Sequence, residues 1–520
     1  MIGFDVVALS RLQFALTALF DFLFISLTLG LSMILVIMET AYVMSGREIW
    51  RRITQFWGLI FGINFATGLA AGIAMEFQLG ANWAYFAHYV GDIVGTPLAI
   101  GGLAALFLEA TFVGLFFFGW ERLSKCGHLA VTGLVAIGAS LSTLWIVVAN
   151  GWMQNPVGAH FNYRTMRMEL SSFSEVLFNP VAQAKFVHTV AAGYTLGSVF
   201  VLAISAWYLL RGRNIEVARR SMTVAASFGL VCSVAVVVLG DESGYLDGEY
   251  QKMKFAAIEA QWHTEKPPAA LTLFGFPNVA TRETAAAVKI PWLLGLIATR
   301  SVDTPVAGIF DLVERSRRRI ISGIDAYTAL RVLRMTAPDS QDADAMTTDE
   351  AKRRFEAHQA DLGFGLLLLR YTANPGEATA QQIDAAAWMT VPNVPVLFWG
   401  FRIMVGIGLF LIVLFATAFY LASRHRFDRH RWFLWTAVQS LPLPWIAAET
   451  GWIVAEVGRQ PWAVDGVLPT FLGVSPASTG TLWISLLVFL VFCLALVGLD
   501  AFLIVRTVRR GPDGLGYWPK

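Results

Sequence analysis

Acidic side chains inside apolar segments are the first residues here whose chemistry needs an explanation. Glu449 lies in LPLPWIAAETGWIVAEVGRQPW, a stretch that is otherwise apolar enough for a membrane helix. At helical spacing Trp445, Glu449, Trp452 and Glu456 fall on one side of that helix. A charged acid near the centre of a bilayer costs roughly 2.5 to 3.5 kcal/mol. Glu449 should therefore be protonated, paired or bound to a metal, unless it only joins two helices.

His188, Met404 and Asp21 are expected at the same depth as Glu449. Each lies one to two helical turns inside the outer end of its apolar segment, which places all four ~8 to 12 Å below the outer surface. One imidazole, one thioether and carboxylates in one layer favour heme iron over zinc or copper. A His and Met pair is typical of a low-spin electron-transfer heme. Taken singly, His188 is also explained as a packed polar residue and Met404 as core filling.

Two further polar residues have less specific patterns. Arg402 precedes Met404 by two residues and so points to a different side of the helix, where a heme propionate or an acid could compensate its charge. Glu109, in GGLAALFLEATFVGLFFF, lies near the middle of its segment with no basic residue close in sequence. It reads equally well as a proton-relay residue and as a neutral acid that bridges two helices.

The composition is that of a polytopic membrane protein. The chain has 520 residues, of which 56% are hydrophobic and only 15% charged, and its mean hydropathy is +0.58. Its three cysteines lie far apart with no CxxC pair, which argues against zinc, iron–sulfur ligation or a disulfide framework. The net charge of +2, with basic residues in short clusters, predicts no nucleic-acid partner.

The apolar runs predict an all-α fold with nine transmembrane helices in the lipid bilayer. We place them near residues 13–43, 54–76, 97–119, 128–149, 182–210, 221–240, 396–421, 432–454 and 480–506. Basic residues gather in alternate connections, which predicts an outside N-terminus and a cytoplasmic C-terminus. These residues are Arg47, Arg51, Arg52, Arg122, Lys125, Arg211, Arg213, Arg219, Arg220, Arg424, Arg426, Arg429, Arg431, Arg506, Arg509 and Arg510.

A long polar segment divides the chain into three parts. Residues 1–240 hold the first six helices, and residues 394–520 hold the last three with the C-terminal tail. Between them residues 241–393 form an outer loop with helices of its own. Loops of this length are usually functional or disordered.

The chain resembles subunit I of the cytochrome bd quinol oxidases over essentially its whole length. The matching stretches are LSRLQFALTA, MEFQLGANWAYFAHYVGDI, FVGLFFFGWERL, VANGWMQNP, NPVAQAKFVHTVA, VLGDESGY, ATRSVDTPV, FRIMVG and PLPWIAAETGWIVAEVGRQPW. The stretch after Ser316 resembles the branch of the family with a long quinol loop. Nine spans with an outward N-terminus are also the family's architecture.

The resemblance implies three hemes: a low-spin heme b, a high-spin heme b and a chlorin-type heme d where oxygen is reduced. It makes His188 and Met404 the axial pair of the low-spin heme, with Arg402 beside it. Glu449 becomes an axial ligand at the high-spin pair, with Trp445 near it. The resemblance further implies that Tyr245, Lys254 and Glu259 bind quinol in the outer loop, and that Glu109 belongs to the proton route.

Two departures from the family pattern fall on the oxygen-reducing centre. Where the family has a histidine in a motif like TAxxHFLF, this sequence reads TALFDFLF and has Asp21. Where the family has an acid before the glycine of LAIxGL, this sequence has Gly101. Asp21 could still ligate iron, but a carboxylate reaches less far than an imidazole and favours the ferric state. Oxygen chemistry could therefore be altered or impaired.

The resemblance also implies partners and a location. The family works in the bacterial inner membrane as a complex with a second membrane subunit, subunit II, and usually a small single-span subunit. Its substrates are quinol and O2. Two other readings stay open at this point: a quinol-oxidising electron-transfer or sensor subunit with impaired O2 reduction, and a transporter without cofactor.

Overall fold

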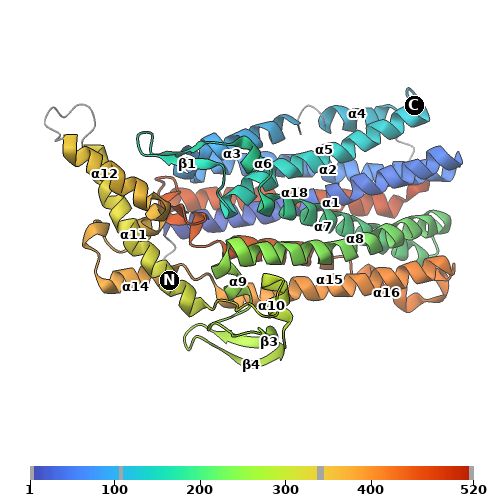
Figure 1. Ribbon diagram of the computed structural model, residues 1–520. Coiled ribbons are helices and arrows are strands. Elements are labelled where there is room, and N and C mark those ends of the chain that lie inside the picture. Colours follow the sequence, from blue (N-terminus) through green and yellow to red (C-terminus); the bar gives the residue numbers. More distant parts are fainter. Residues whose placement is uncertain (1–4, 105–108, 336–344, 515–520) are drawn as a thin grey trace.

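The main body of the protein is a bundle of long helices that lie side by side (Figure 1). The computed structural model describes residues 5–104, 109–335 and 345–514. Within this part of the chain, seven segments are long and apolar enough to cross a membrane. Their main helices are α1 (Val6–Ser45), α2 (Glu48–Asn82), α5 (Lys125–Gln154), α7 (Pro180–Leu210), α8 (Ile215–Tyr250), α15 (Val394–Ser423) and α18 (Thr479–Arg510). The chain is therefore an integral membrane protein.

The structure describes the third and the eighth expected spans in two parts each. The third comprises α3 (Ala84–Ala104), which contains Pro97, and α4 (Ala110–Phe118), and residues 105–108 lie outside the described part. The eighth comprises α16 (Arg431–Gln439) and α17 (Leu443–Gly458). Pro442 and Pro444 lie at this second break, and proline has no N–H to continue the helical hydrogen bonds. Within the described residues, seven of the nine expected spans are continuous helices of membrane length.

Close packing between α1 and α7 fixes their relative height. A Cβ on Gly197 would lie 2.6 Å from backbone atoms of Gly30, so neither position has space for a side chain. Four residues earlier on α7, Gly193 lies against Ser26 and Leu29 of α1. Contacts that advance along both helices in the same direction show that α1 and α7 run parallel.

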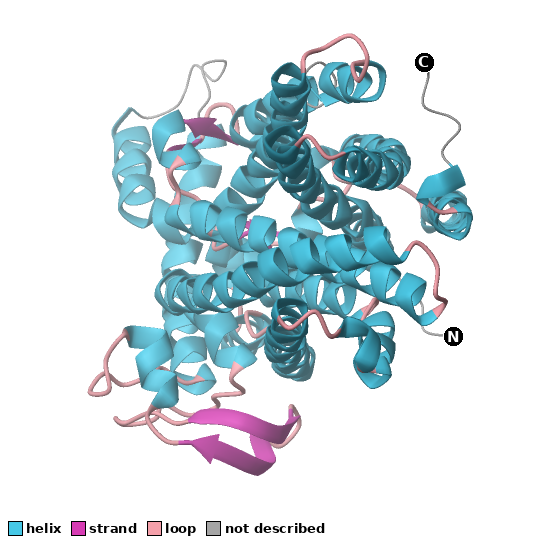
Figure 2. Cartoon of the chain, turned by 90° about the vertical axis from the view of Figure 1, so that its right-hand side faces the viewer, coloured by secondary structure: helices cyan, strands magenta, loops and turns pink. Residues whose placement is uncertain are grey.

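Outside the bundle lies a layer of short elements that the all-α expectation did not fully anticipate. Its helices are α6 (Phe173–Leu177), α9 (Lys252–Ile258), α10 (Leu293–Thr299), α11 (Ile309–Met335), α12 (Ala345–His358), α13 (Leu362–Leu366) and α14 (Ala380–Met389). Three antiparallel hairpins join them: β1 (Ala159–Asn162) with β2 (Arg167–Leu170), β3 (Leu271–Asn278) with β4 (Glu283–Ile290), and β5 (Trp462–Val464) with β6 (Leu468–Pro469). The view along the bundle in Figure 2 shows the β3–β4 hairpin projecting beyond the helices.

The sixth span and the start of the segment 241–393 form one continuous helix. α8 passes Asp241 without a break and ends at Tyr250. The expected helices do occur in the rest of the loop.

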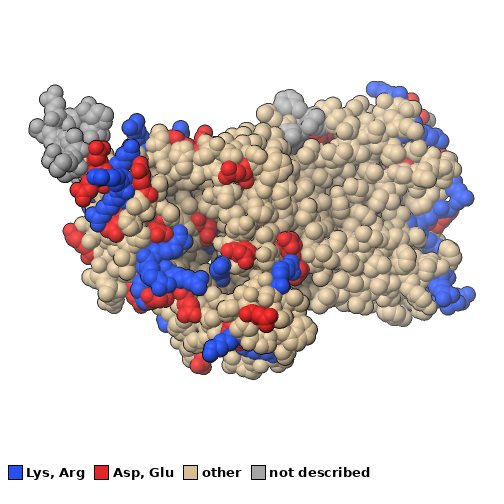
Figure 3. Space-filling view, in the orientation of Figure 1, with Lys and Arg blue, Asp and Glu red and all other residues tan. Residues whose placement is uncertain are grey.

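Charged side chains lie mainly toward the two ends of the molecule. In Figure 3 Lys and Arg mark one end of the bundle, mixed charges cover the other end, and uncharged residues cover the band between them. Such a band is what contact with lipid requires, since charged groups are costly in hydrocarbon.

Candidate functional site

Asp21 and His188 lie at the same height in the bundle. Asp21 precedes Gly30 by nine residues (30 − 21), and His188 precedes Gly197 by nine residues (197 − 188). Because Gly30 and Gly197 are in contact on parallel helices, equal steps along the two helices end at equal heights. Asp21 nevertheless lies 15 residues, ~22 Å, inside α1, because this helix begins farther out than expected.

His188 is half-buried and faces α8. A Cβ on Gly240 would lie 3.2 Å from Cε1 and 3.6 Å from Nδ1 of the imidazole, so the ring lies against a glycine. Nδ1 is buried and, among the described residues, has no well-formed hydrogen bond. A buried ring nitrogen without a partner is unusual and fits a position next to a bound group.

Met404 faces α17 rather than the lipid. A Cβ on Gly451 would lie 2.9 Å from its Sδ atom. Met404 lies on α15, which packs against both α8 and α17. α8 is the helix that His188 contacts, and α17 is the helix that carries Glu449. The structure thus brings the helices of all three residues together.

Two tryptophans place α17 against α1. Trp445 donates a hydrogen bond from Nε1 to the Leu23 carbonyl at 3.0 Å, and Trp452 stacks on Phe22 with ring centroids 4.1 Å apart. Glu449 lies between these two contacts in sequence, which puts it near the height of Asp21. Both of its carboxylate oxygens are buried without a hydrogen-bond partner among the described residues. His188, Met404, Glu449 and Asp21 therefore form one layer across the bundle.

The surroundings of Asp21 and Gly101 differ. Asp21 is buried, with an unpartnered Oδ1 that faces Gly72 of α2. At Gly101 a Cβ would lie only 3.0 Å from Cβ of Trp145, so Trp145 occupies the space into which a larger side chain would extend. An acid at this position would require Trp145 to move.

Glu109 immediately precedes α4 and lies against α5. Its side chain is buried, with Cγ 3.0 Å from where a Cβ on Gly138 would be. Its Oε1 atom has no hydrogen-bond partner in the described part of the chain. This lack of a partner favours a proton-relay role over a hydrogen-bonded bridge between helices.

The quinol-site candidates belong to three separate contact networks. Lys254, on α9, is buried and donates to Asp247 at 2.7 Å and Gln251 at 2.8 Å. Glu259, at the end of α9, is also buried and accepts a hydrogen bond from Arg402 at 3.0 Å. Burial raises the pKa of the Glu259 carboxyl, and the Arg402 charge partly opposes this rise. Arg402 is therefore compensated by an acid, one of the two partners that the sequence suggested.

Tyr245 contacts a different charged group from the other two candidates. Its ring lies 5.0 Å from the guanidinium of Arg300, which follows α10 and pairs with Asp241 and Glu242 of α8. The resemblance assigned all three residues to the quinol site. Lys254 lies on α9 and Glu259 caps the end of this helix, whereas Tyr245 lies on α8.

A cavity of about 240 Å³ opens beside Lys254. Its wall includes Gln251, Arg319, Trp462 and Asp465, so the turn between β5 and β6 contributes to it. Burial raises the pKa of Asp465 to about 6, while the nearby Lys254 opposes the shift. Asp465 belongs to no sequence motif with an expected role, and no local pattern predicts that it lies near Lys254.

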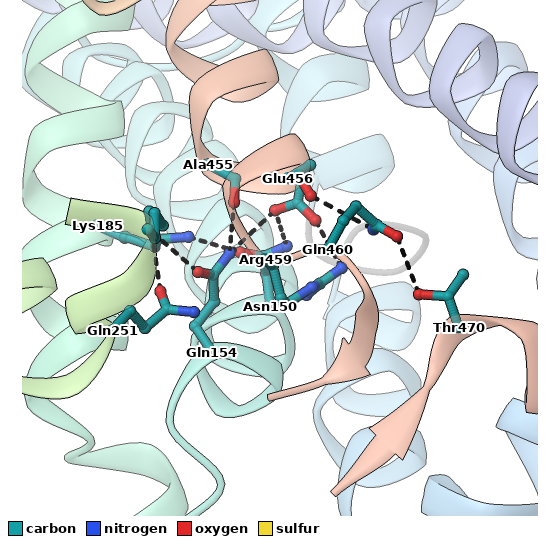
Figure 4. Close-up of polar contacts among 10 residues, drawn as sticks. Asn150, Gln154, Lys185, Gln251, Ala455, Glu456, Arg459, Gln460 and Thr470 are labelled. Carbon is teal, nitrogen blue, oxygen red and sulfur yellow. Dashed lines mark hydrogen bonds and ion pairs between the residues drawn. The ribbon is translucent and has the colours of Figure 1, made fainter. Parts of the chain in front are cut away.

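A buried polar network extends from this cavity to residues of α5, α7 and α17 (Figure 4). Lys254 donates to Gln154 at 3.1 Å, and Gln154 donates to Glu456 at 3.2 Å. Asn150 also donates to Glu456, at 2.9 Å, and accepts from Lys185 at 3.0 Å. Glu456 appeared in the sequence only as a member of the α17 stripe. The polar residues of VANGWMQ, which follow the expected fourth span and belong to α5, were the available sign of the network.

The donor set of this layer consists of single groups from separate helices. Among the described residues no three His, Cys, Asp or Glu side chains lie together as a metal-binding group. Unpartnered donors at His188 and Glu449, with the thioether of Met404 nearby in the layer, suit heme iron, which takes one or two axial ligands from the protein. The residues present therefore fit a heme.

A family model decides between the possible readings. The model for cytochrome bd terminal oxidase subunit I matches residues 9–512. The chain belongs to this family. It is the first subunit of a bd-type oxidase, an enzyme of respiratory electron transport that carries heme and has more than one subunit. Membership argues against a transporter without cofactor.

Relatives and solved structures agree with the bd oxidase family. The chain is 48% identical to cytochrome bd-II ubiquinol oxidase subunit 1 of Escherichia coli (strain K12), over 98% of both chains. It is 31% identical to cytochrome bd ubiquinol oxidase subunit 1 of Bacillus subtilis (strain 168), over 97% of this chain and 94% of that protein. A solved bd oxidase structure from Geobacillus thermodenitrificans matches with a TM-score of 0.78 at 26% identity, covering 98% of this chain and 100% of that one.

Proposed function

We propose that this subunit oxidises a quinol at its outer side and passes the electrons to O2, which is reduced to water. The observation that carries the proposal is the ion pair between Glu259 and Arg402, at 3.0 Å. It joins a buried acid of the outer loop to the helix that bears Met404, two residues farther on. Relatives named as ubiquinol oxidases support the substrate class.

The proposed arrangement in the membrane has nine spans, an outside N-terminus and a cytoplasmic C-terminus. Residues 1–240 and 394–520 form the membrane parts, and residues 241–393 form the periplasmic quinol-binding loop. The bacterial inner membrane is the proposed location. The alternate basic clusters of the sequence and the charge distribution in Figure 3 support this orientation.

We further propose that His188 and Met404 hold a low-spin heme b, and that Glu449 and Asp21 face a high-spin heme b and a chlorin-type heme d. Bound hemes would supply single-electron transfer and the O2-reducing iron. Trp445 keeps α17 against α1 through its bond to Leu23, and so positions the Glu449 carboxylate. Arg402 anchors the outer loop above the low-spin site.

Helix α17 carries two acids. The assignment of one of them as the heme ligand therefore needs a direct test. Among the described residues Glu449 has no hydrogen-bond partner. Glu456 lies two turns farther out on the same stripe and is already bonded to Asn150 and Arg459. The free carboxylate favours Glu449. Glu449→Gln should then remove a high-spin heme signal that Glu456→Gln retains, and the reverse result would transfer the role to Glu456.

Protons are proposed to move outward on both sides of the layer, from quinol to the outside and from the cytoplasm to the oxygen site. Lys254 and Glu259 bind the quinol oxygens, and Glu259 takes up a proton that is released outside. Glu109 is buried immediately before α4, and its Oε1 atom has no partner among the described residues. It transfers cytoplasmic protons toward the oxygen site. Each proton that crosses the membrane in this way stores about 2.3 kcal/mol per 100 mV of membrane potential.

The proposed complex includes a second membrane subunit, subunit II, and a small single-span subunit. Large apolar side chains are exposed along α18, which fits coverage by lipid or by helices of such partners. Ile484, Leu487, Val488 and Val491 are examples, each more than half exposed.

The test compares two rates in the purified complex: quinol-dependent heme reduction and quinol-dependent oxygen uptake. The proposal expects both, with oxygen uptake limited by the altered centre. Heme reduction without oxygen uptake would make the chain an electron-transfer or sensor subunit, and a protein without heme absorption would overturn the proposal.

A further inference from the structure

An exposed apolar surface covers the β3–β4 hairpin and α10. Seven large apolar side chains there are between 42 and 56% exposed: Leu273, Phe274, Phe276, Val279, Val288, Trp292 and Leu296. Scattered apolar residues are normal on protein surfaces, but a large apolar patch marks an interaction site, and the elements that carry these side chains are in contact with one another. We call these seven residues the hairpin face.

The hairpin face lies beside a membrane-spanning helix and not above it. Arg402 donates from Nε to the carbonyls of Thr272 at 3.1 Å and Leu273 at 3.2 Å, at the start of β3. Arg402 is eight residues (402 − 394) into α15, which corresponds to ~12 Å along the helix. The Arg402 guanidinium reaches back toward the start of α15, because Nη1 donates to the Phe398 carbonyl at 3.0 Å. The start of the hairpin is therefore at the level of the second turn of α15.

Aromatic contacts make the hairpin face continuous with the outer surface of α15. The rings of Phe274 and Phe276 pack against Trp399 with centroids 5.4 and 6.0 Å apart. On the same side of α15 as Trp399 lie Val396 and Ile403, which are 39 and 44% exposed. This stripe faces outward on a helix that crosses the membrane, so the hairpin extends a lipid-facing surface sideways, as the projection in Figure 2 shows.

The hairpin is held in place at its far end. The guanidinium of Arg282, in the turn, lies 3.4 Å from the ring centroid of Trp388 on α14. Trp262 donates from Nε1 to Thr284 of β4 at 3.2 Å, and Lys289 is paired with Glu265. The apolar side chains are therefore exposed on an element that is fixed in place. Its basic residues already have partners within the protein, so its apolar side chains are the groups left to contact a binding partner.

We propose that the hairpin face inserts into the outer leaflet at the boundary between headgroups and acyl chains. Aromatic rings are favoured at this depth, and amphipathic elements bind there by burying their apolar side. We choose lipid as the partner of the hairpin face because this face continues the outward-facing surface of α15. The proposal does not depend on the oxidase activity.

Fluorescence quenching in nanodiscs tests the depth of this surface in the intact complex. The exposed native cysteine is removed by Cys126→Ser, and an environment-sensitive fluorophore is attached at Phe276→Cys. Glu356→Cys, at an exposed position on α12, is the matched control. The discs contain phosphatidylcholine with a nitroxide either near the head or near the end of its acyl chain, and iodide serves as the quencher in water. Unchanged heme absorption shows that each variant is folded.

The label at position 276 should be quenched by the nitroxide near the lipid head, more weakly by the deeper nitroxide, and little by iodide. The label at position 356 should respond to iodide alone. Quenching of position 276 by iodide without quenching by lipid would place the hairpin in water. Protection from all three quenchers would mean that another protein chain covers it, and either result overturns the proposal.

Discussion

Glu259 accepts a hydrogen bond from Nη2 of Arg402 at 3.0 Å, so that a buried acid of the outer loop is fixed to the helix of Met404. Arg402 also donates to the Ile258 carbonyl at 2.9 Å and therefore holds the end of α9 in place. This one side chain connects the proposed quinol site with the proposed low-spin heme.

Glu259→Gln keeps the size of the side chain and removes its charge. A hydrogen bond to a charged group contributes about 2 kcal/mol, so kcat/KM for quinol should fall roughly thirty-fold. Steady-state oxygen uptake at varied quinol concentration measures the change. Glu356→Gln, on the exposed surface of α12, is the control and should leave the kinetics unchanged. An unaltered kcat/KM in Glu259→Gln would remove this residue from the quinol site.

Asp21→His should raise oxygen uptake and change the high-spin heme absorption. The position is buried and faces Gly72, and an imidazole extends farther than a carboxylate toward a bound iron. Gly101→Glu alone should have a smaller benefit, because the new side chain must displace Trp145. If Asp21→His changed neither turnover nor spectrum, the position would have no part in oxygen chemistry.

Asp465 should make stability depend on pH between about 4 and 6. Burial raises its pKa from 3.8 to about 6, so in this range the folded protein binds a proton that the unfolded chain has released. The contribution of protonated Asp465 to stability is fully present below the pKa of this residue in the unfolded chain. It is lost as the pH rises through the pKa of this residue in the folded protein. Thermal unfolding of Asp465→Asn should therefore show a smaller decrease across this range than the wild type, and parallel curves would contradict the assignment.

Glu39 and His128 form a buried pair at the opposite end of the bundle. Nδ1 of His128 lies 2.6 Å from Oε1 of Glu39, and Thr132 donates to the other oxygen at 2.5 Å. Breaking such a pair leaves a buried group without its partner, so Glu39→Ala should destabilise the protein by about 3 kcal/mol or more. Thr132→Val, which removes one hydrogen bond, should cost about 1 kcal/mol. Equal melting temperatures for the two variants would argue against the pair.

The seven continuous spans were predictable from sequence, because few structures other than a transmembrane helix accommodate an apolar run of membrane length. The interruption at Ser440–Pro442 was less predictable, since the residues around it remain apolar and the prolines alone do not determine whether a helix bends or ends. The β3–β4 hairpin was missed because its exposed Phe274 and Phe276 do not alternate with polar residues in the usual pattern of a water-facing strand.

The candidate layer was predictable from residue type and depth, whereas pairings between distant segments were not. His188, Met404, Glu449 and Asp21 stand out because each is a polar or sulfur-bearing group at similar depth in an apolar run. The pair of Glu39 with His128 spans 89 residues, and the bond from Gln154 to Glu456 spans 302. No local pattern indicates such contacts, which depend on how the helices pack.

The reduced-minus-oxidised absorption spectrum of His188→Ala, recorded beside that of His160→Ala, tests the heme layer most directly. His160 lies in the outer hairpin of β1 and β2 and contacts Ser171, so its loss should leave every heme signal in place. We expect His188→Ala to lose the low-spin heme b signal and the heme extracted with it. A low-spin signal that persists in His188→Ala at the wild-type amplitude would contradict the ligation of this heme by His188 and Met404.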